Sequence, residues 1–263
     1  MNKNSIGIFD SGIGGTSIWR EIHELLPFED TVYLADSFNA PYGIKTREEI
    51  IELSRKNTIR LLELGAKIIV VACNTATTNA INELRNEFDV SFIGIEPAIK
   101  PAALQSRTKN IGILATKGTL SSSLFTKTSD LYTHGLKVIE VEGNGLVELI
   151  EAGKIYSTEM DMLLDQLLAP LISQPIDYLV LGCSHYPYLI PRLKEKFNPA
   201  LSIIDSGEAV ARQTKAILEK ENLLNTDFQQ KGTCTFYTNY DPYVLKHIIK
   251  RDNEDFQVKR LDF

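Results

Sequence analysis

Short apolar runs alternate with longer amphipathic segments along most of the chain. The apolar runs predict strands, and the segments between them repeat their apolar positions every three or four residues, as helices do. This alternation is typical of βα units, which build a parallel sheet. The predicted helices include 46–64, 75–88, 160–171, 187–197 and 208–219. The predicted strands are 5–9, 31–35, 67–72, 91–95, 110–115, 137–141, 177–181, 201–204 and 234–237.

Two stretches of the chain resemble two later ones at a similar displacement. IGIFDSG at 6–12 resembles IGILATKG at 111–118, and VVACNTAT at 70–77 resembles LVLGCSHYP at 179–187. The shared order predicts two related halves, with Cys73 and Cys183 at equivalent strand ends, where open α/β sheets bind ligands. We therefore expect an α/β protein of two pseudo-symmetric parallel-sheet domains with the active site in the cleft between them. The expected domains are 1–97 with 208–263, and 98–207.

Composition narrows the class of protein. A chain of 263 residues with 43% hydrophobic and 24% charged residues has the mix of an ordinary globular protein. The net charge of −6 argues against nucleic acid or an anionic membrane as the main partner. No apolar stretch reaches the roughly 18 residues needed to span a bilayer, and the first predicted strand begins too early to leave room for a signal peptide. We expect a cytoplasmic protein.

The three cysteines are odd in number and widely spaced, which favours free thiols over a disulfide framework. Cys73 and Cys183 each follow a predicted strand and precede a predicted helix, whose N-terminus favours a thiolate. Either cysteine alone is more simply explained as buried and inert. Their matching contexts favour a reactive pair. Cys234 lies inside a strand-like run, and we interpret it as structural.

Other polar side chains are expected near the two thiols. His185 could hold the proton of Cys183, and Asp10 could pair with a substrate ammonium or assist a thiol. Each also has a simpler explanation, as a residue that starts a helix or holds a turn. Thr116 and Thr119 follow the strand that resembles the first one and would suit a carboxylate. Glu151, taken alone, is a solvated helix residue.

Several familiar sites are excluded by their signatures. The glycines after Asp10 do not form a dinucleotide fingerprint, because Ser17 occupies the position of the third glycine. There is no phosphate-binding loop ending in Gly-Lys-Ser/Thr, and no second Asp follows Asp10 as in dehalogenase-type phosphatases. Cys183 and His185 could supply only two metal ligands, with no second cluster to complete a zinc site. We expect no metal.

Six motifs occur together in an order and spacing that resemble bacterial glutamate racemases. They are FDSGIGG, ADSFNAPYG, VVACNTAT, IEPA, LIEAG and LGCSHYP, and the resemblance covers nearly the whole chain, through to FYTNYDP at 236–242. The resemblance implies two α/β domains, usually in a homodimer, and no cofactor. It implies that L- and D-glutamate are interconverted, and that the D-glutamate supplies peptidoglycan synthesis.

The resemblance also implies roles at matching positions. Cys73 would take the Cα proton of D-glutamate and Cys183 that of L-glutamate, with Asp10 and His185 assisting them respectively. Glu151 matches a further carboxylate of the motif. The residues implied to contact glutamate are Asp10, Ser11, Tyr42, Gly43, Asn74, Thr75, Ser184 and His185.

The chain departs from the family pattern in three places. Ser184 replaces a Thr common in relatives, VEGNG lacks a frequent Cys-Pro, and the chain begins a few residues before IGIFDSG. We therefore do not expect the activation by a cell-wall precursor that is found in relatives with an N-terminal extension. An aspartate or hydantoin racemase with two thiols is the nearest alternative, and a non-catalytic module that binds a small carboxylate is another.

Overall fold

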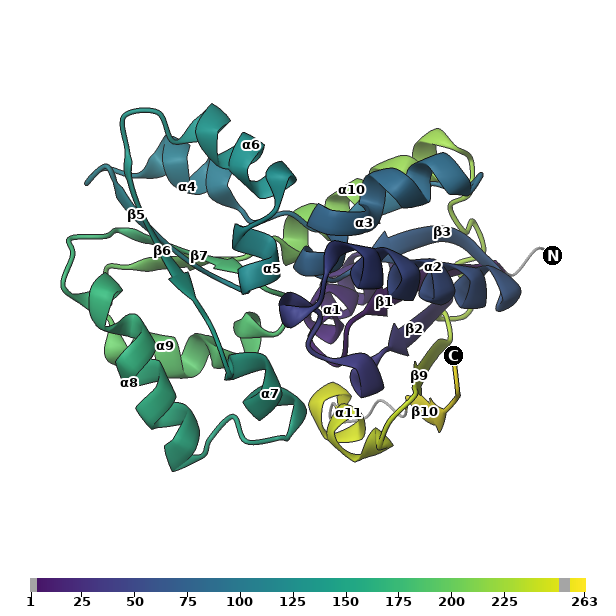
Figure 1. Cartoon of the computed structure of the whole chain (residues 1–263). Helices are drawn as coiled ribbons and strands as arrows, with labels where there is room; N and C mark the ends of the chain where they lie inside the picture. The colour runs from purple at the N-terminus through teal and green to yellow at the C-terminus, as the bar shows by residue number, and fades with distance from the viewer. Residues whose placement is uncertain (1–3, 251–255) are drawn as a thin grey trace.

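A computed structural model describes residues 4–250 and 256–263, and within these residues ten strands form two sheets (Figure 1). The strands of the larger sheet are β1 (Ser5–Asp10), β2 (Thr31–Ala35), β3 (Ala66–Val71), β4 (Phe92–Gly94), β9 (Cys234–Thr238) and β10 (Gln257–Arg260). Those of the smaller sheet are β5 (Asn110–Ala115), β6 (Lys137–Glu142), β7 (Tyr178–Gly182) and β8 (Ser202–Ile204). All neighbouring strands are parallel.

The two sheets repeat one strand order. The larger sheet runs β10-β9-β2-β1-β3-β4 and the smaller one β6-β5-β7-β8, so β5 corresponds to β1 and β7 to β3. These are the strands whose sequences resemble each other. The predicted pair of pseudo-symmetric parallel-sheet α/β domains is confirmed.

Helices cover both faces of the larger sheet. On one face lie α2 (Arg47–Glu63) and α3 (Asn74–Glu87), and on the other α1 (Thr16–Leu25), α10 (Gly207–Lys220) and α11 (Pro242–Ile249). The run 68–71 alternates between the two core clusters, which explains why it is apolar at every position. α2 begins where predicted, because Thr46 and Glu49 form a reciprocal capping box.

The smaller sheet is also covered on both faces (Figure 1). One face packs on α4 (Ile99–Gln105) and α6 (Ser123–Tyr132), and the other on α8 (Thr158–Ile172) and α9 (Ile190–Lys196). Two short helices, α5 (Lys117–Leu120) and α7 (Leu146–Glu151), follow β5 and β6 at the carboxyl edge of the sheet. This edge faces the larger domain.

The chain leaves the larger sheet after β4 and returns to it through α10, which packs along α1. The division into domains 1–97 with 208–263 and 98–207 stays a prediction. Residues 1–3 and 251–255 of the predicted first domain lie outside the described residues. In the part of the chain that is described, no helix has the length and apolar character needed to cross a membrane.

The predicted helix 187–197 is wrong in its first three residues. Residues Tyr186–Leu189 form a short 3-10 helix, η3, and the α-helix starts at Ile190. The reason is Pro191, which has no N–H to bond the carbonyl four residues earlier, so a single α-helix cannot run through this point. Strand β10 and helix α1 were not predicted.

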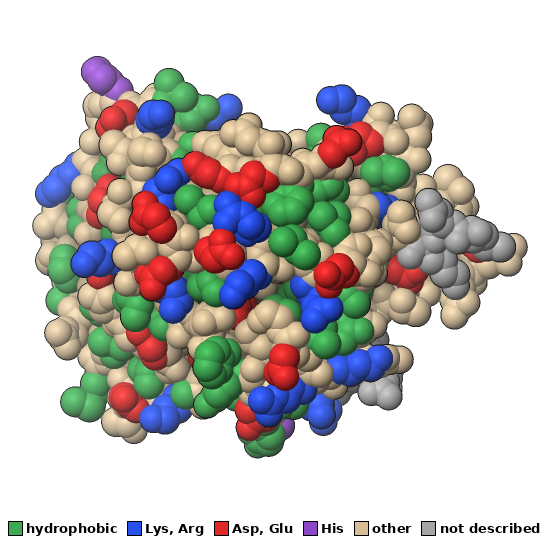
Figure 2. Space-filling view, turned by 45° about the vertical axis from the view of Figure 1, so that its right-hand side comes forward, with side chains coloured by type: hydrophobic (Ala, Val, Ile, Leu, Met, Phe, Trp, Pro, Cys, Tyr) green, Lys and Arg blue, Asp and Glu red, His purple; other side chains and the backbone are tan. Residues whose placement is uncertain are grey.

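Acidic and basic side chains are interspersed on the surface rather than separated, as the face in Figure 2 shows. Some of them link neighbouring helices, as Arg55 on α2 does with Glu87 on α3. Exposed pairs of this kind contribute little to stability. The face in Figure 2 therefore does not carry the continuous basic patch that a nucleic-acid surface requires.

Candidate active site

Cys73 and Cys183 line one small cavity between the two domains. Cys73 lies two residues beyond β3 and Cys183 directly follows β7, so the equivalence of the strands places both thiols at the carboxyl edges of their sheets. The two residues are 4% and 6% exposed. The cavity holds about 10 Å³ of free space and is lined by Ser11, Pro41, Tyr42, Gly43, Cys73, Asn74, Thr75, Thr116, Val147, Cys183, Ser184 and His185.

The Cys73 thiol caps helix α3. Its sulfur accepts a hydrogen bond from Ala76 N at 3.4 Å, and the thiol can donate to Ser11 Oγ at 3.6 Å. The helix N-terminus was expected to favour a thiolate. Instead, burial and the nearby Asp10 carboxyl raise the pKa of Cys73 well above its usual range, outweighing the bond from Ala76. Cys73 is therefore a neutral thiol in this structure.

The surroundings of Cys183 differ from those of Cys73. His185 Nδ1 lies 3.8 Å from Cys183 Sγ, and His185 Nε2 lies 2.6 Å from Glu151 Oε1. Burial lowers the pKa of His185, but the contacts with Cys183, Glu151 and Asp10 raise it well above the ordinary value. An imidazolium here donates from both nitrogens, toward the sulfur and toward the carboxylate. The imidazolium of His185 thus lies between the Cys183 sulfur and the Glu151 carboxylate. The expected helix N-terminus after Cys183 is absent, because η3 starts only at Tyr186.

Glu151 joins the two domains. From α7 of the smaller domain, its Oε1 accepts from Ile13 N at 2.7 Å and its Oε2 accepts from Ser37 Oγ at 2.9 Å. Its side chain is only 15% exposed, so it is not the solvated helix residue that its local sequence suggests. The carboxylate thus holds His185 and the larger domain at the same time.

Asp10 lies at the end of β1 and is fully buried. Its Oδ2 accepts from Gly15 N at 2.9 Å, and its Oδ1 accepts from Ser184 Oγ at 3.1 Å, across the domain boundary. Burial raises its pKa. The direct hydrogen bonds of Asp10 thus reach the Cys183 side of the site, and it influences Cys73 through its charge.

The glycines after Asp10 allow the domains to approach. A Cβ at Gly12 would lie 1.9 Å from Glu151 Oε1, and one at Gly14 would lie 2.2 Å from His185 Nδ1. Gly14 N also faces His185 Nε2 at 3.2 Å, although a protonated Nε2 that donates to Glu151 cannot accept from it. Close packing against the other domain explains why glycines occur at these positions. Their motif resembles a nucleotide-binding loop but lacks its third glycine.

Tyr42 is held by a buried polar network that sequence reasoning missed. Tyr42 OH donates to Asp36 Oδ2, and Asp36 Oδ1 also accepts from Asn39 Nδ2 at 2.7 Å and from Asn239 Nδ2 at 2.6 Å. Asn57 Nδ2 donates to Tyr42 OH at 3.0 Å. These partners come from three segments of the chain, so no local motif predicts the network.

Hydroxyl groups from both domains meet at one side of the cavity. Thr75 Oγ1 lies 2.8 Å from Thr116 Oγ1 and 3.4 Å from Thr119 Oγ1. Thr75 is in the first turn of α3, and Thr116 caps α5. Asn74 is next to them and 2% exposed, and among the described residues neither polar atom of its side chain has a hydrogen-bond partner. Hydroxyls and an unpaired amide beside two thiols suit a carboxylate ligand.

Other candidate sites are weaker. Within residues 4–250 and 256–263, no group of three or more His, Cys, Asp and Glu side chains is arranged to hold a metal ion. Cys234 lies away from the cavity, with its sulfur 3.5 Å from His23 Nδ1.

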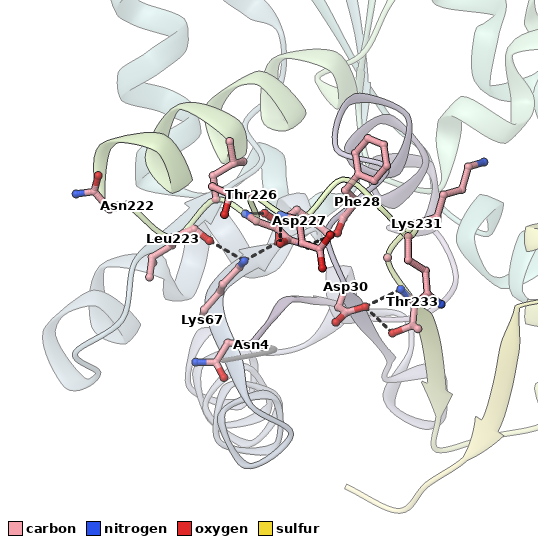
Figure 3. Close-up of a pocket in the computed structure, with 15 residues that line it drawn as sticks. Asn4, Phe28, Asp30, Lys67, Asn222, Leu223, Thr226, Asp227, Lys231 and Thr233 are labelled. Carbon is pink, nitrogen blue, oxygen red and sulfur yellow. Dashed lines mark hydrogen bonds and ion pairs between the residues drawn. The ribbon is translucent and has the colours of Figure 1, made fainter. Parts of the chain in front are cut away.

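A larger cavity of about 590 Å³ lies at the amino edge of the larger sheet, where Lys67 reaches toward the 222–233 segment (Figure 3). Because it contains neither thiol nor histidine, we place the chemistry in the smaller cavity.

The fold and the site define a class of enzyme, a racemase built from two parallel-sheet domains with paired thiols between them. The chain belongs to the Asp/Glu/Hydantoin racemase family, because the sequence pattern of that family matches residues 6–214. Within this family it is 43% identical over 242 residues to a glutamate racemase of Herpetosiphon aurantiacus, covering 92% of this chain and 95% of that one. It is also 43% identical over 250 residues to a glutamate racemase of Pseudomonas aeruginosa, covering 95% and 94%.

A solved structure gives the same result. The chain superimposes on the glutamate racemase of Escherichia coli with a TM-score of 0.85, at 30% identity and 98% coverage of both chains. That protein was crystallised with L-glutamate and the activator UDP-MurNAc-Ala. The expected family, fold and class of isomerase are thus confirmed.

Proposed function

We propose that this protein interconverts L- and D-glutamate by moving the Cα proton between Cys73 and Cys183. The observation that carries the proposal is the pair of thiols from equivalent strand ends of two domains, lining one cavity together with carboxylate-binding groups. Racemisation needs a base on one side of Cα and an acid on the other, and two opposed thiols are a minimal way to supply both.

In each turnover one cysteine is a thiolate and the other a thiol. The thiolate removes the Cα proton, the electron pair stays on the substrate as a carbanion, and the other thiol delivers its proton to the opposite face. The enzyme is left with the two protonation states exchanged. In the L-to-D direction Cys183 is the base, and the imidazolium of His185 stabilises its thiolate. In the reverse direction Cys73 is the base, with Asp10 as its assisting group.

Thiol basicity alone is insufficient for this reaction. If the pKa of the Cα–H lies roughly 20 units above that of a thiol, the gap is about 27 kcal/mol. The site must therefore stabilise the carbanion with preorganised donors. Thr75, Thr116 and Thr119 would face the substrate carboxylate, and Ser11, Tyr42, Gly43, Asn74 and Ser184 would complete the contacts. No step in this sequence uses a cofactor or a metal.

The decisive experiment is turnover of L-glutamate in D₂O without added cofactor. The product D-glutamate should carry deuterium at Cα from its first appearance, while the remaining L-glutamate stays unlabelled early in the reaction. Product that keeps the original hydrogen would exclude exchange between two thiols. So would a requirement for pyridoxal phosphate.

The two cysteines can be tested one at a time. Cys73→Ser and Cys183→Ser should each reduce racemisation to near background and leave proton exchange or elimination on one enantiomer only. Cys234→Ser is the matched control, because Cys234 is equally buried but lies outside the cavity. Normal racemisation by Cys183→Ser would contradict the mechanism.

The substrate is tested against the nearest alternatives. Optical rotation of L-glutamate, L-aspartate and hydantoins should change only with glutamate, as the curated relatives lead us to expect. A preference for aspartate would move the chain to another branch of the family. A pure binding module would turn over none of them, and its thiols would show no reaction with iodoacetamide that glutamate prevents.

We also propose a cytoplasmic homodimer that supplies D-glutamate for peptidoglycan. This part is supported by the family resemblance and by large exposed side chains around the domain boundary, such as Phe38, Tyr240 and Tyr243. Light scattering should give twice the mass of the 29.5 kDa chain. A monomer at micromolar concentration would contradict the dimer and leave the racemase proposal intact.

A further inference from the structure

The first turn of α1 packs against the segment that follows Cys183. Ser17 Oγ donates to Ser184 O at 2.9 Å, and Thr16 Oγ1 lies 2.5 Å from Tyr188 OH. Arg20, one turn further along α1, lies with its guanidinium carbon 5.5 Å from the centroid of the Tyr188 ring. Three neighbouring positions of one helix thus hold a short segment of the other domain.

The direction of the Thr16–Tyr188 bond follows from the remaining partners. Thr16 Oγ1 donates its single proton to Ile13 O at 2.6 Å, so Tyr188 OH must be the donor toward Thr16. Thr16 is completely buried, and it belongs to the same domain as Cys73. The bond therefore ties the Cys183 segment to the domain that carries the other thiol.

A short path connects Tyr188 to the reacting sulfur. Tyr188 N donates to His185 O at 3.2 Å, and Tyr186 N donates to Cys183 O at 3.1 Å, within one tight turn. Tyr188 is thus part of the same tight turn as Cys183 and His185. Cys73 lies two residues beyond β3, in the other domain, and its sulfur is hydrogen-bonded to Ser11 and Ala76 of that domain.

We propose that Tyr188, bonded to Thr16, is a positioning residue that sets the distance of Cys183 from the substrate Cα. The proposal rests on the two-thiol function above and adds a residue to it. Because the contact reaches one thiol only, its loss should slow the proton transfer at Cys183 and leave that at Cys73 nearly unchanged. Tyr188 itself lies outside the residues that line the cavity.

A simple rate comparison cannot reveal this asymmetry. The two enantiomers have equal free energies in water, so the values of kcat/KM in the two directions must fall by the same factor in any variant. The isotope effect of Cα-deuterated substrate is different. With L-glutamate it reports on removal of the deuteron by Cys183, and with D-glutamate on removal by Cys73.

The test uses Tyr188→Phe, which keeps the ring under Arg20 and removes only the hydroxyl. We expect kcat/KM to fall roughly tenfold in both directions, because small misplacements of a reacting group are costly. The isotope effect on L-glutamate should rise and that on D-glutamate should fall. Thr16→Val should reproduce the shift, and Thr16→Ser, which keeps the hydroxyl, should restore the wild-type values.

The controls separate positioning from general damage. Tyr178→Phe removes a comparable hydroxyl, bonded to Gln105 Oε1 at 3.0 Å on an exposed part of the smaller domain, and should change neither rate nor isotope effects. An unchanged ratio of the L to the D isotope effect in Tyr188→Phe would overturn the proposal, even if activity or Tm fell. Failure of the two-thiol function would instead appear in wild-type enzyme, as product without Cα deuterium.

Discussion

Asn74 lies beside the reacting Cys73, and its buried, unpaired side-chain amide destabilises the folded protein. It is buried at the start of α3, and both polar atoms of its side chain lack partners within the described residues. An unsatisfied buried amide costs about 1–3 kcal/mol. Its retention beside Cys73 is understandable if the substrate completes its bonds.

Asn74→Ala should therefore make the free enzyme more stable by about 1 kcal/mol, since the unpaired amide disappears and Ala favours a helix. The same change should raise KM for glutamate about tenfold, because a bond to the substrate is lost. Thermal unfolding without and with glutamate, together with steady-state kinetics, checks both effects. A variant that is less stable and binds glutamate normally would argue for a structural role.

The protonation of His185 should be visible in the stability of the protein. Its neighbours raise its pKa in the folded protein, whereas in the unfolded chain the value is near 6.5. The stabilisation is therefore complete below about pH 6.5 and is lost as the pH rises through the folded value. Each unit of difference between the two values corresponds to about 1.4 kcal/mol.

His185→Asn provides the comparison, because Asn has similar polarity and does not titrate. Denaturant unfolding from pH 6 to pH 9 should show wild-type protein losing its advantage over the variant as the pH increases. A difference in unfolding free energy that stays constant over this range would mean that His185 is neutral when folded.

Sequence reasoning found the residues whose signal is local. Cys73 and Cys183 follow apolar strands and precede turn or cap residues, and their positions needed no knowledge of the fold beyond the βα rhythm. Glu151 had no such signal, because Ile13, Ser37 and His185 come to it from other segments. The same holds for Asp36 and Asn239, which are brought together from residues about two hundred positions apart.

At the scale of elements, the amino edge of the larger sheet is held by a buried ion pair. Lys67 at the start of β3 lies 2.6 Å from Glu29 Oε2, and the side chains are 9% and 3% exposed. Lys67 Nζ also donates to Leu223 O, and Asn225 N donates to Glu29 Oε1. The pair thus fastens the 222–233 segment, which links α10 to β9, against the edge of the sheet (Figure 3).

Lys67→Met should destabilise the protein by about 3 kcal/mol, because Glu29 is left as an uncompensated buried charge. Combining it with Glu29→Leu should recover much of the loss, since both charges are then absent. Denaturant unfolding of the three proteins measures this. The activity of the folded variants should remain normal, because the pair lies at the edge of the sheet opposite Cys73, and a large loss would indicate coupling between the two edges.

Element boundaries were predictable where a cap marks them. Thr46 caps α2 at the predicted start, whereas α8, which is capped by Ser157, begins two residues before the predicted start at 160. The segment after Cys183 was predicted less well, because its 3-10 turn depends on contacts with α1 of the other domain as well as on its prolines. Contacts between distant segments cannot be predicted from the sequence of either segment alone.

At the scale of the whole molecule, the site is closed. The cavity between the thiols has about 10 Å³ of free space, about the minimum that a single water requires. Glutamate is much larger than a water molecule, so we expect the two domains to move apart when it enters. The contacts that hold them together, including the bond from Ser37 Oγ to Glu151 Oε2, therefore limit access to both thiols.

Ser37→Ala removes one interdomain bond without touching either cysteine. If the bond contributes about 1 kcal/mol, the open form becomes about fivefold more populated. Iodoacetamide should then label Cys73 and Cys183 up to fivefold faster, and D-glutamate should protect both. Ser121→Ala, which removes an exposed bond within the smaller domain, is the control. Equal labelling rates in wild type and Ser37→Ala would show that another contact limits opening.

The repeated strand order has a consequence for the handedness of the chemistry. Each half of the molecule offers a single sulfur at the tip of its inner strand, and such a half could take hydrogen from a carbon but could not return it from behind. Only when the halves face each other does the carbon lie between two donors. Inversion is thus a property of the junction, because neither half alone places an acid and a base on opposite sides of one carbon.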